Sequence, residues 1–76
     1  MNIKWQMTEH LWWMYATDSV AVAMVNDLNE SPYEARYFAN KIYPDGTVLF
    51  TGHVTNEFDT LADAKHWCEM MYNTGA

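Results

Sequence analysis

The last third of the chain most constrains the fold, because it holds one well-marked amphipathic helix. Its apolar residues recur at spacings of three and four, which places them on one helical face: Leu61, Ala64, Trp67, Cys68 and Met71. Thr60 is the predicted N-cap, with its hydroxyl accepting from the amide of Asp63, and Asn73-Thr74-Gly75 is a stop signal. A helix from about Leu61 to Tyr72 is therefore predicted. Such a short helix is marginal alone, so it must pack on a sheet.

A β-hairpin is predicted before this helix. Pro44-Asp45-Gly46 separates two apolar stretches, Tyr33 to Tyr43 and Thr47 to Val54. Proline fixes a φ angle suited to a turn, and glycine supplies the positive φ that closes it. Gly52 marks a candidate bulge in the second strand. Aromatic residues fall on both faces of the first strand, so the alternation leaves open which face is buried.

The stretch Met1 to Asp18 is the least regular part of the chain. Its start alternates apolar and polar residues, which predicts an edge strand, and the aromatic-rich run Leu11 to Ala16 predicts a second strand. A short helix over residues 8–16, capped by Thr8, is the alternative to this second strand, and we favour the strand. Another strand is expected at Val20 to Val25, which is rich in β-branched residues.

Together these elements predict a single small α+β domain over residues 1–76. We expect an antiparallel meander of three to four strands with one C-terminal helix packed on one face, because short connections favour antiparallel neighbours. A chain of this size buries only about 60% of the surface that its unfolded form exposes. Its core is therefore small.

The charge balance restricts the classes of partner. Ten acidic and four basic side chains give a net charge of −6, which disfavours direct binding to nucleic acid or to an anionic membrane and favours basic protein partners. No window reads as a signal peptide or a membrane span. The single cysteine, Cys68, cannot form an internal disulfide. These features predict a cytoplasmic protein.

No pattern in the chain predicts catalysis, a metal site or a cofactor. His66 and Cys68 stand two positions apart on the predicted helix and point in different directions, unlike a zinc-binding pair. Cys68 lies at an apolar helical position, where a thiol is hidden and its pKa is raised. Glu57 and Asp59 flank the predicted helix start, where acids stabilise the helix dipole. We therefore expect a non-enzymatic protein.

Aromatic side chains provide the first functional hint. One helix cannot cover four tryptophans, five tyrosines and three phenylalanines, each of which can bury roughly 150–250 Å². An exposed aromatic patch marks a partner or self-association surface, and a more curved sheet that buries the same residues is the alternative. The aromatic candidates for partner binding are Trp12, Trp13, Tyr33 and Tyr37.

Acidic side chains provide the second hint. Loops and hairpin tips present charge to a partner at little cost to folding, and the acidic candidates for partner binding are Asp27, Glu30, Glu34 and Asp45. A solubilising surface is one interpretation of this charge. The other is that it imitates a phosphate backbone and occupies a basic channel of a nucleic-acid-binding protein.

The short acidic chain, its aromatic-rich sheet, its PDG hairpin and its FDTLADAKHW segment resemble small phage- and prophage-encoded proteins of the anti-CRISPR or host-takeover type. The likeness covers about Tyr43 to Tyr72. It implies an inhibitor in the cytoplasm of a bacterial host, which binds a defence or nucleic-acid-handling protein complex without turnover; the acidic surface would make this inhibitor a DNA mimic. The alternative is a homodimeric structural or accessory protein whose exposed aromatic sheet face is its self-interface.

Overall fold

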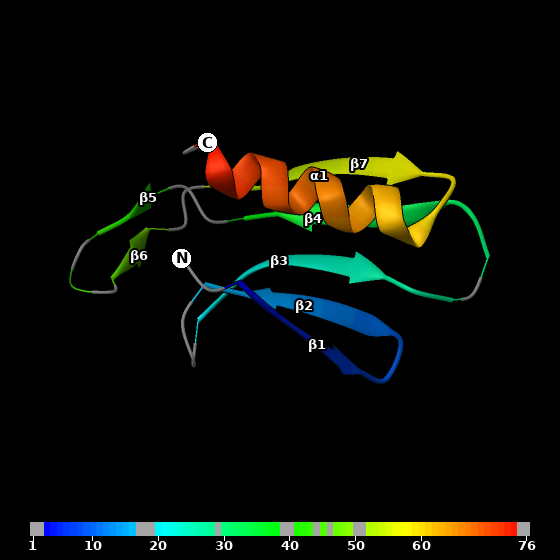
Figure 1. Ribbon diagram of the computed structural model, residues 1–76, viewed down its shortest axis with the longest axis horizontal. Coiled ribbons are helices and arrows are strands. Elements are labelled where there is room, and N and C mark those ends of the chain that lie inside the picture. Colours follow the sequence, from blue (N-terminus) through cyan, green and yellow to red (C-terminus); the bar gives the residue numbers. More distant parts are fainter. Residues whose placement is uncertain are drawn as a thin grey trace.

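A computed structural model shows the fold and describes residues 3–16, 20–28, 30–38, 41–43, 45, 47–49 and 52–74. Five strands form one antiparallel sheet in the order β1-β2-β3-β4-β7 (Figure 1): they are β1 (Lys4–Thr8), β2 (Leu11–Tyr15), β3 (Ala21–Asn26), β4 (Tyr33–Tyr37) and β7 (Val54–Phe58). β5 (Lys41–Ile42) and β6 (Val48–Leu49) form a separate two-stranded ribbon. The predicted α+β meander is confirmed, but the predicted number of strands was too low.

The N-terminal region forms a hairpin of β1 and β2. Trp5 pairs with Met14 and Met7 pairs with Trp12, so the aromatic-rich run is a strand and the helical alternative over residues 8–16 is wrong. Glu9 makes the turn between the strands with a φ of 58°, a left-handed conformation that few residues other than glycine adopt. The strand predicted at Val20 to Val25 is also confirmed, shifted by one residue.

The predicted hairpin around Asp45 exists, but it is interrupted. β5 and β6 pair next to the turn, where Asp45 accepts a hydrogen bond from the Thr47 amide at 3.0 Å, and β4 pairs with β7 farther away. Pro44 and Gly46 of the predicted turn lie outside the described residues.

A register shift accounts for the interruption. Tyr37 pairs with Val54, and Lys41 pairs with Leu49. The segment between Leu49 and Val54 is therefore one residue longer than the segment between Tyr37 and Lys41. One extra residue moves later side chains to the opposite face. The two uninterrupted strands that we predicted are therefore β4, β5, β6 and β7.

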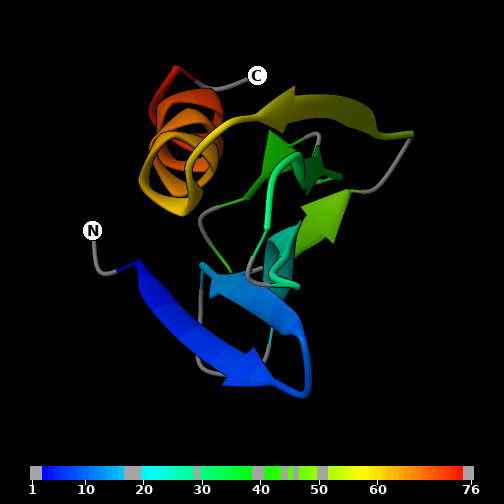
Figure 2. The ribbon, with the colours of Figure 1, turned by 90° about the vertical axis from the view of Figure 1, so that its right-hand side faces the viewer.

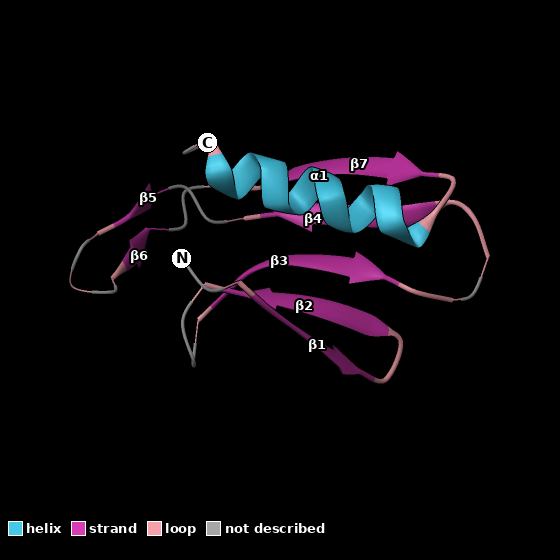
Figure 3. Cartoon of the chain, viewed as in Figure 1, coloured by secondary structure: helices cyan, strands magenta, loops and turns pink. Residues whose placement is uncertain are grey.

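α1 (Leu61–Asn73) closes the fold, within one residue of its predicted end. Thr60 caps it as expected, since its hydroxyl accepts a hydrogen bond from the Asp63 amide at 3.2 Å. The helix packs against β3, β4 and β7 and runs along β4 and β7 (Figure 3). Its buried residues join side chains of the sheet in one core: Ala64, Cys68, Tyr72, Met14, Val22, Ala23, Val25, Ala35 and Tyr37. Within the described ranges no helix has the length and apolar character to cross a membrane.

Candidate functional site

The strand register assigns each side chain of the sheet to one of two faces. Residues paired across antiparallel strands share a face, so Trp12, Val25 and Ala35 lie on one side. Val25 and Ala35 belong to the core beneath α1, which identifies this side as the helix-covered face. Figure 2 looks along the molecule and shows α1 on one side of the sheet.

The opposite side of the sheet is the candidate site, which we call the open face. Trp13 pairs with Met24 and Met24 pairs with Arg36, which places all three on this side. Among the described elements only α1 packs broadly over the sheet, and it covers the other side. We define the open face by its half-buried members, which are Leu11, Trp13, Tyr15, Met24 and Arg36; the exposed Lys4, which pairs with Tyr15, lies at its edge.

These open-face side chains are half-buried although no described element lies over them. Cross-strand neighbours on one face of a sheet bury part of one another's side-chain surface. Aromatic, methionine and arginine side chains are also the types enriched at the centres of protein interfaces. The open face thus has the composition of a protein-binding surface.

Arg36 links the apolar part of the open face to an acidic border. One terminal guanidinium nitrogen lies 3.7 Å from Oε1 of Glu34, with 39% and 47% of the two side chains exposed. Its Nε is buried and has no hydrogen-bond partner among the described residues. A buried donor without a hydrogen-bond partner is unfavourable.

The acidic border consists of Glu34 and Glu57, which stand directly opposite each other on β4 and β7. Both are exposed, and both lie on the open face because Glu34 is two residues from Arg36 on one strand. Like charges at opposed positions of a sheet repel each other. A basic group from a partner would remove that repulsion, so this border favours positive charge.

Two of the predicted partner-binding residues are buried, which contradicts the exposure expected for them. Asp27 is only 6% exposed because its amide bonds to the carbonyl of His10 at 2.7 Å, which extends the β2–β3 pairing and draws the residue into the sheet. Tyr37 is 4% exposed beneath α1, and burial, together with Tyr72 and Cys68, raises the pKa of its phenol.

The remaining predicted residues do not form one surface. Glu34 and Trp13 lie on the open face, whereas Trp12 and Tyr33 are half-buried on the helix-covered face. Glu30 is exposed in the loop before β4. Asp45 is exposed at the ribbon turn, and the hydrogen bond from the Thr47 amide lowers the pKa of its carboxyl.

Sequence reasoning missed most members of the open face. Leu11 and Tyr15 are each two residues from Trp13 along β2, so strict alternation from Trp13 would have placed them on the same face. Met24, Arg36 and Glu57 join the same face only through long-range pairing. No signal in the sequence brings those strands together in this register.

A second cluster lies on the helix-covered face, which we call the indole cage: Trp5, Trp12, Lys65, Glu69 and Asp27. Lys65 Nζ is 3.4 Å from the ring centroid of Trp12 and 5.3 Å from that of Trp5. The indole N–H of Trp5 donates to Glu69 Oε2 at 2.7 Å, and that of Trp12 to Asp27 Oδ2 at 2.9 Å. This cluster joins the β1–β2 hairpin to α1.

The described residues contain no group of three or more histidine, cysteine and acidic side chains that could hold a metal ion. Burial, with Glu69 nearby, raises the pKa of the Cys68 thiol to about 12. A thiol in that environment is a poor nucleophile.

Comparison with protein-family models, with curated proteins and with solved structures found no match to this chain.

Proposed function

We propose that this chain is a non-enzymatic protein-binding domain whose open face docks a partner with apolar side chains and a basic group. The observation that carries the proposal is a set of large half-buried side chains on a sheet face that no described element covers. Interface centres commonly hold tryptophan, tyrosine and arginine. Trp13, Tyr15 and Arg36 provide these residue types close together on the open face.

The acidic border favours a basic partner over a second copy of the chain. Each copy carries a net charge of −6, so two copies repel each other over distances of about a Debye length. A lysine or arginine placed between Glu34 and Glu57 would instead neutralise a like-charge pair.

The narrower proposal is an inhibitor of a host defence or nucleic-acid-handling complex, in the manner of small phage proteins. Its support is the excess of acidic over basic side chains and the acidic border, since proteins that bind nucleic acid carry basic channels. The homodimer is the second candidate, supported by the same uncovered apolar surface.

The test compares matched baits in affinity capture from a bacterial lysate. Trp13→Ser removes the aromatic centre, and the double variant Glu34→Gln/Glu57→Gln removes the acidic border. The matched control, Glu9→Gln/Asp63→Asn, removes the same charge from exposed positions in the β1–β2 turn and on α1. Bound proteins are quantified at about 50 mM and about 300 mM salt, because screening weakens exposed ion pairs.

We expect the wild type and the control to recover the same basic protein. Each open-face variant should recover at least tenfold less of it, and recovery by the wild type should fall at high salt. Equal recovery with all baits, or recovery of no specific protein, contradicts the proposal. Sedimentation equilibrium tests the homodimer separately. If the wild type is a dimer and Trp13→Ser is a folded monomer, the open face is a self-interface instead.

A further inference from the structure

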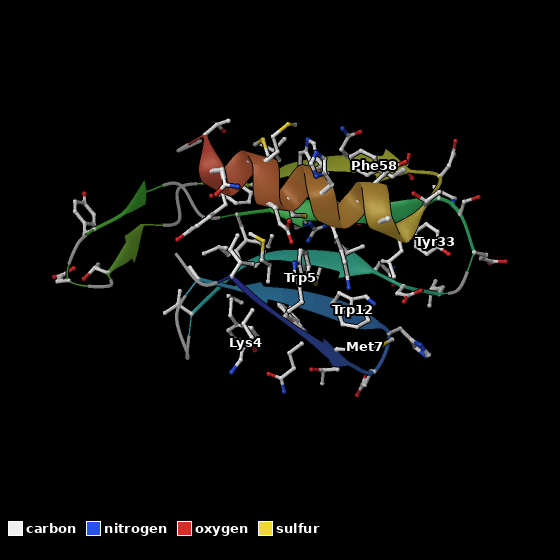
Figure 4. All side chains as sticks on the ribbon, viewed as in Figure 1. Lys4, Trp5, Met7, Trp12, Tyr33 and Phe58 are labelled. Atoms are coloured by element: carbon white, nitrogen blue, oxygen red, sulfur yellow. The ribbon has the colours of Figure 1, made fainter. Side chains whose placement is uncertain are left out.

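The ammonium group of Lys65 lies within reach of two indole rings from two different strands. Trp5 comes from β1 and Trp12 from β2, and Figure 4 shows both side chains on the side of these strands that α1 occupies. The centroid distances of 3.4 Å and 5.3 Å both fall within about 6 Å, the range in which an aromatic face attracts a cation. The two rings therefore form a cage of the kind that recognises ammonium groups.

Two carboxylates increase the preference of this cage for positive charge. Each indole N–H donates to one of them, Trp5 to Glu69 at 2.7 Å and Trp12 to Asp27 at 2.9 Å. A donor bonded to an anion is polarised, which leaves the ring face more negative. Asp27 is held in place by burial, with 6% of its surface exposed. The cage thus combines two ring faces with two nearby negative charges.

The cage borders solvent, and Lys65 reaches into it from α1. Trp5, Trp12, Lys65 and Glu69 are all half-buried, and the neighbouring Met7 is 43% exposed. The broad contacts of α1 are with β3, β4 and β7, so the lysine reaches the hairpin through its flexible side chain. A change of rotamer would carry its charged end into water and leave the indole faces open.

We propose that the pair Trp5 and Trp12 is a binding site for an alkylammonium group of a ligand, and that Lys65 is its built-in competitor. The ligand class comprises methylated lysine side chains and choline-like molecules, which share a cation with an apolar surface. Because the ligand must displace Lys65, its apparent affinity is reduced by the fraction of time that the cage is filled. This site is on the helix-covered face and is independent of the open face.

The test titrates choline and a trimethyllysine-containing peptide into wild type and Lys65→Ala, with NMR detection of the indole N–H signals. Trp13 and Trp67 serve as internal controls, since neither belongs to the cage. We expect saturable shifts of the Trp5 and Trp12 signals in the wild type, and about tenfold tighter binding by Lys65→Ala. The neutral isostere of choline, 3,3-dimethylbutanol, should produce no saturable shift.

Lys65→Met is the matched control, because it keeps an unbranched side chain to fill the cage and removes the charge. It should bind the probes more weakly than Lys65→Ala because its side chain still fills the cage, and the wild-type titration still tests the site if Lys65→Ala does not fold. Binding of choline alone assigns the site to small molecules, and binding of the peptide assigns it to methylated proteins. The proposal is overturned if neither probe shifts the cage signals of the wild type, or if the neutral isostere binds equally well.

Discussion

The hydrogen bond between Trp12 and Asp27 allows a direct test of how the β1–β2 hairpin is held. Trp12→Phe keeps an aromatic ring but removes the indole N–H, whose nitrogen donates a hydrogen bond to Asp27 Oδ2 at 2.9 Å. Asp27 is 6% exposed, so water cannot readily replace the lost donor. A hydrogen bond to a charged group contributes about 1.5–3 kcal/mol, and we expect the free energy of unfolding to fall by about 2 kcal/mol. For a domain of this size the melting temperature should fall by about 10 °C.

Trp5→Phe is the matched control, because it makes the same chemical change in the same cage. The acceptor that this change leaves without its indole donor, Glu69, is half-buried, so solvent can take the place of the indole. We expect this variant to lose no more than about 1 kcal/mol. The difference between the two losses in free energy of unfolding therefore measures how much burial of the acceptor strengthens the effect of its hydrogen bond.

The assay is urea denaturation followed by far-UV circular dichroism, which does not depend on tryptophan emission. The double-mutant cycle of Trp12→Phe with Asp27→Ala, which removes the acceptor, should give a coupling energy of about 1–2 kcal/mol with an unchanged m value. If Trp12→Phe and Trp5→Phe cost the same within about 0.3 kcal/mol, or if the coupling energy vanishes, the hydrogen bond to Asp27 does not hold the hairpin.

Three further predictions concern the helix cap, the buried thiol and the acidic border. Thr60→Ala removes the acceptor of the Asp63 amide and should cost about 1 kcal/mol in urea denaturation, whereas Thr60→Ser should retain most of that stability. The pKa of Cys68 is raised from 9.0 to about 12, so its contribution to stability is complete below about pH 9 and is lost as the pH rises toward 12; Cys68→Ala should flatten this alkaline decline in the urea midpoint. Glu57→Gln removes one of two opposed carboxylates and should raise the thermal midpoint at low salt, with the gain shrinking at high salt. A lower midpoint would show that Arg36 already offsets the repulsion.

Local patterns predicted the elements whose causes lie within a few residues. The cap at Thr60, the apolar spacing along α1 and the alternation in β1 act over one or two turns or pairs, and the structure has each of them. The turn at Asp45 belongs to the same group. β7 was missed because its sequence, VTNEF, is largely polar, and it is a strand because β4 offers an edge to pair with.

The candidate surfaces depended on contacts between distant parts of the chain. Trp12 and Trp13 are neighbours with the same side chain, yet one lies in the indole cage and the other on the open face. Alternation predicts that they point to opposite faces, but only the position of α1 decides which face is covered. Asp27 likewise reads as an exposed loop acid and is buried by pairing with His10.

The sequence by itself therefore determined an acidic α+β domain with a capped C-terminal helix on an antiparallel meander, since propensity, alternation and capping are short-range effects. The tertiary structure decided the fifth strand, the interrupted hairpin and the faces on which the aromatic and acidic side chains gather. Register and helix placement minimise exposed apolar surface over the whole molecule. That balance is a property of the complete set of long-range contacts, which no local stretch of this chain contains.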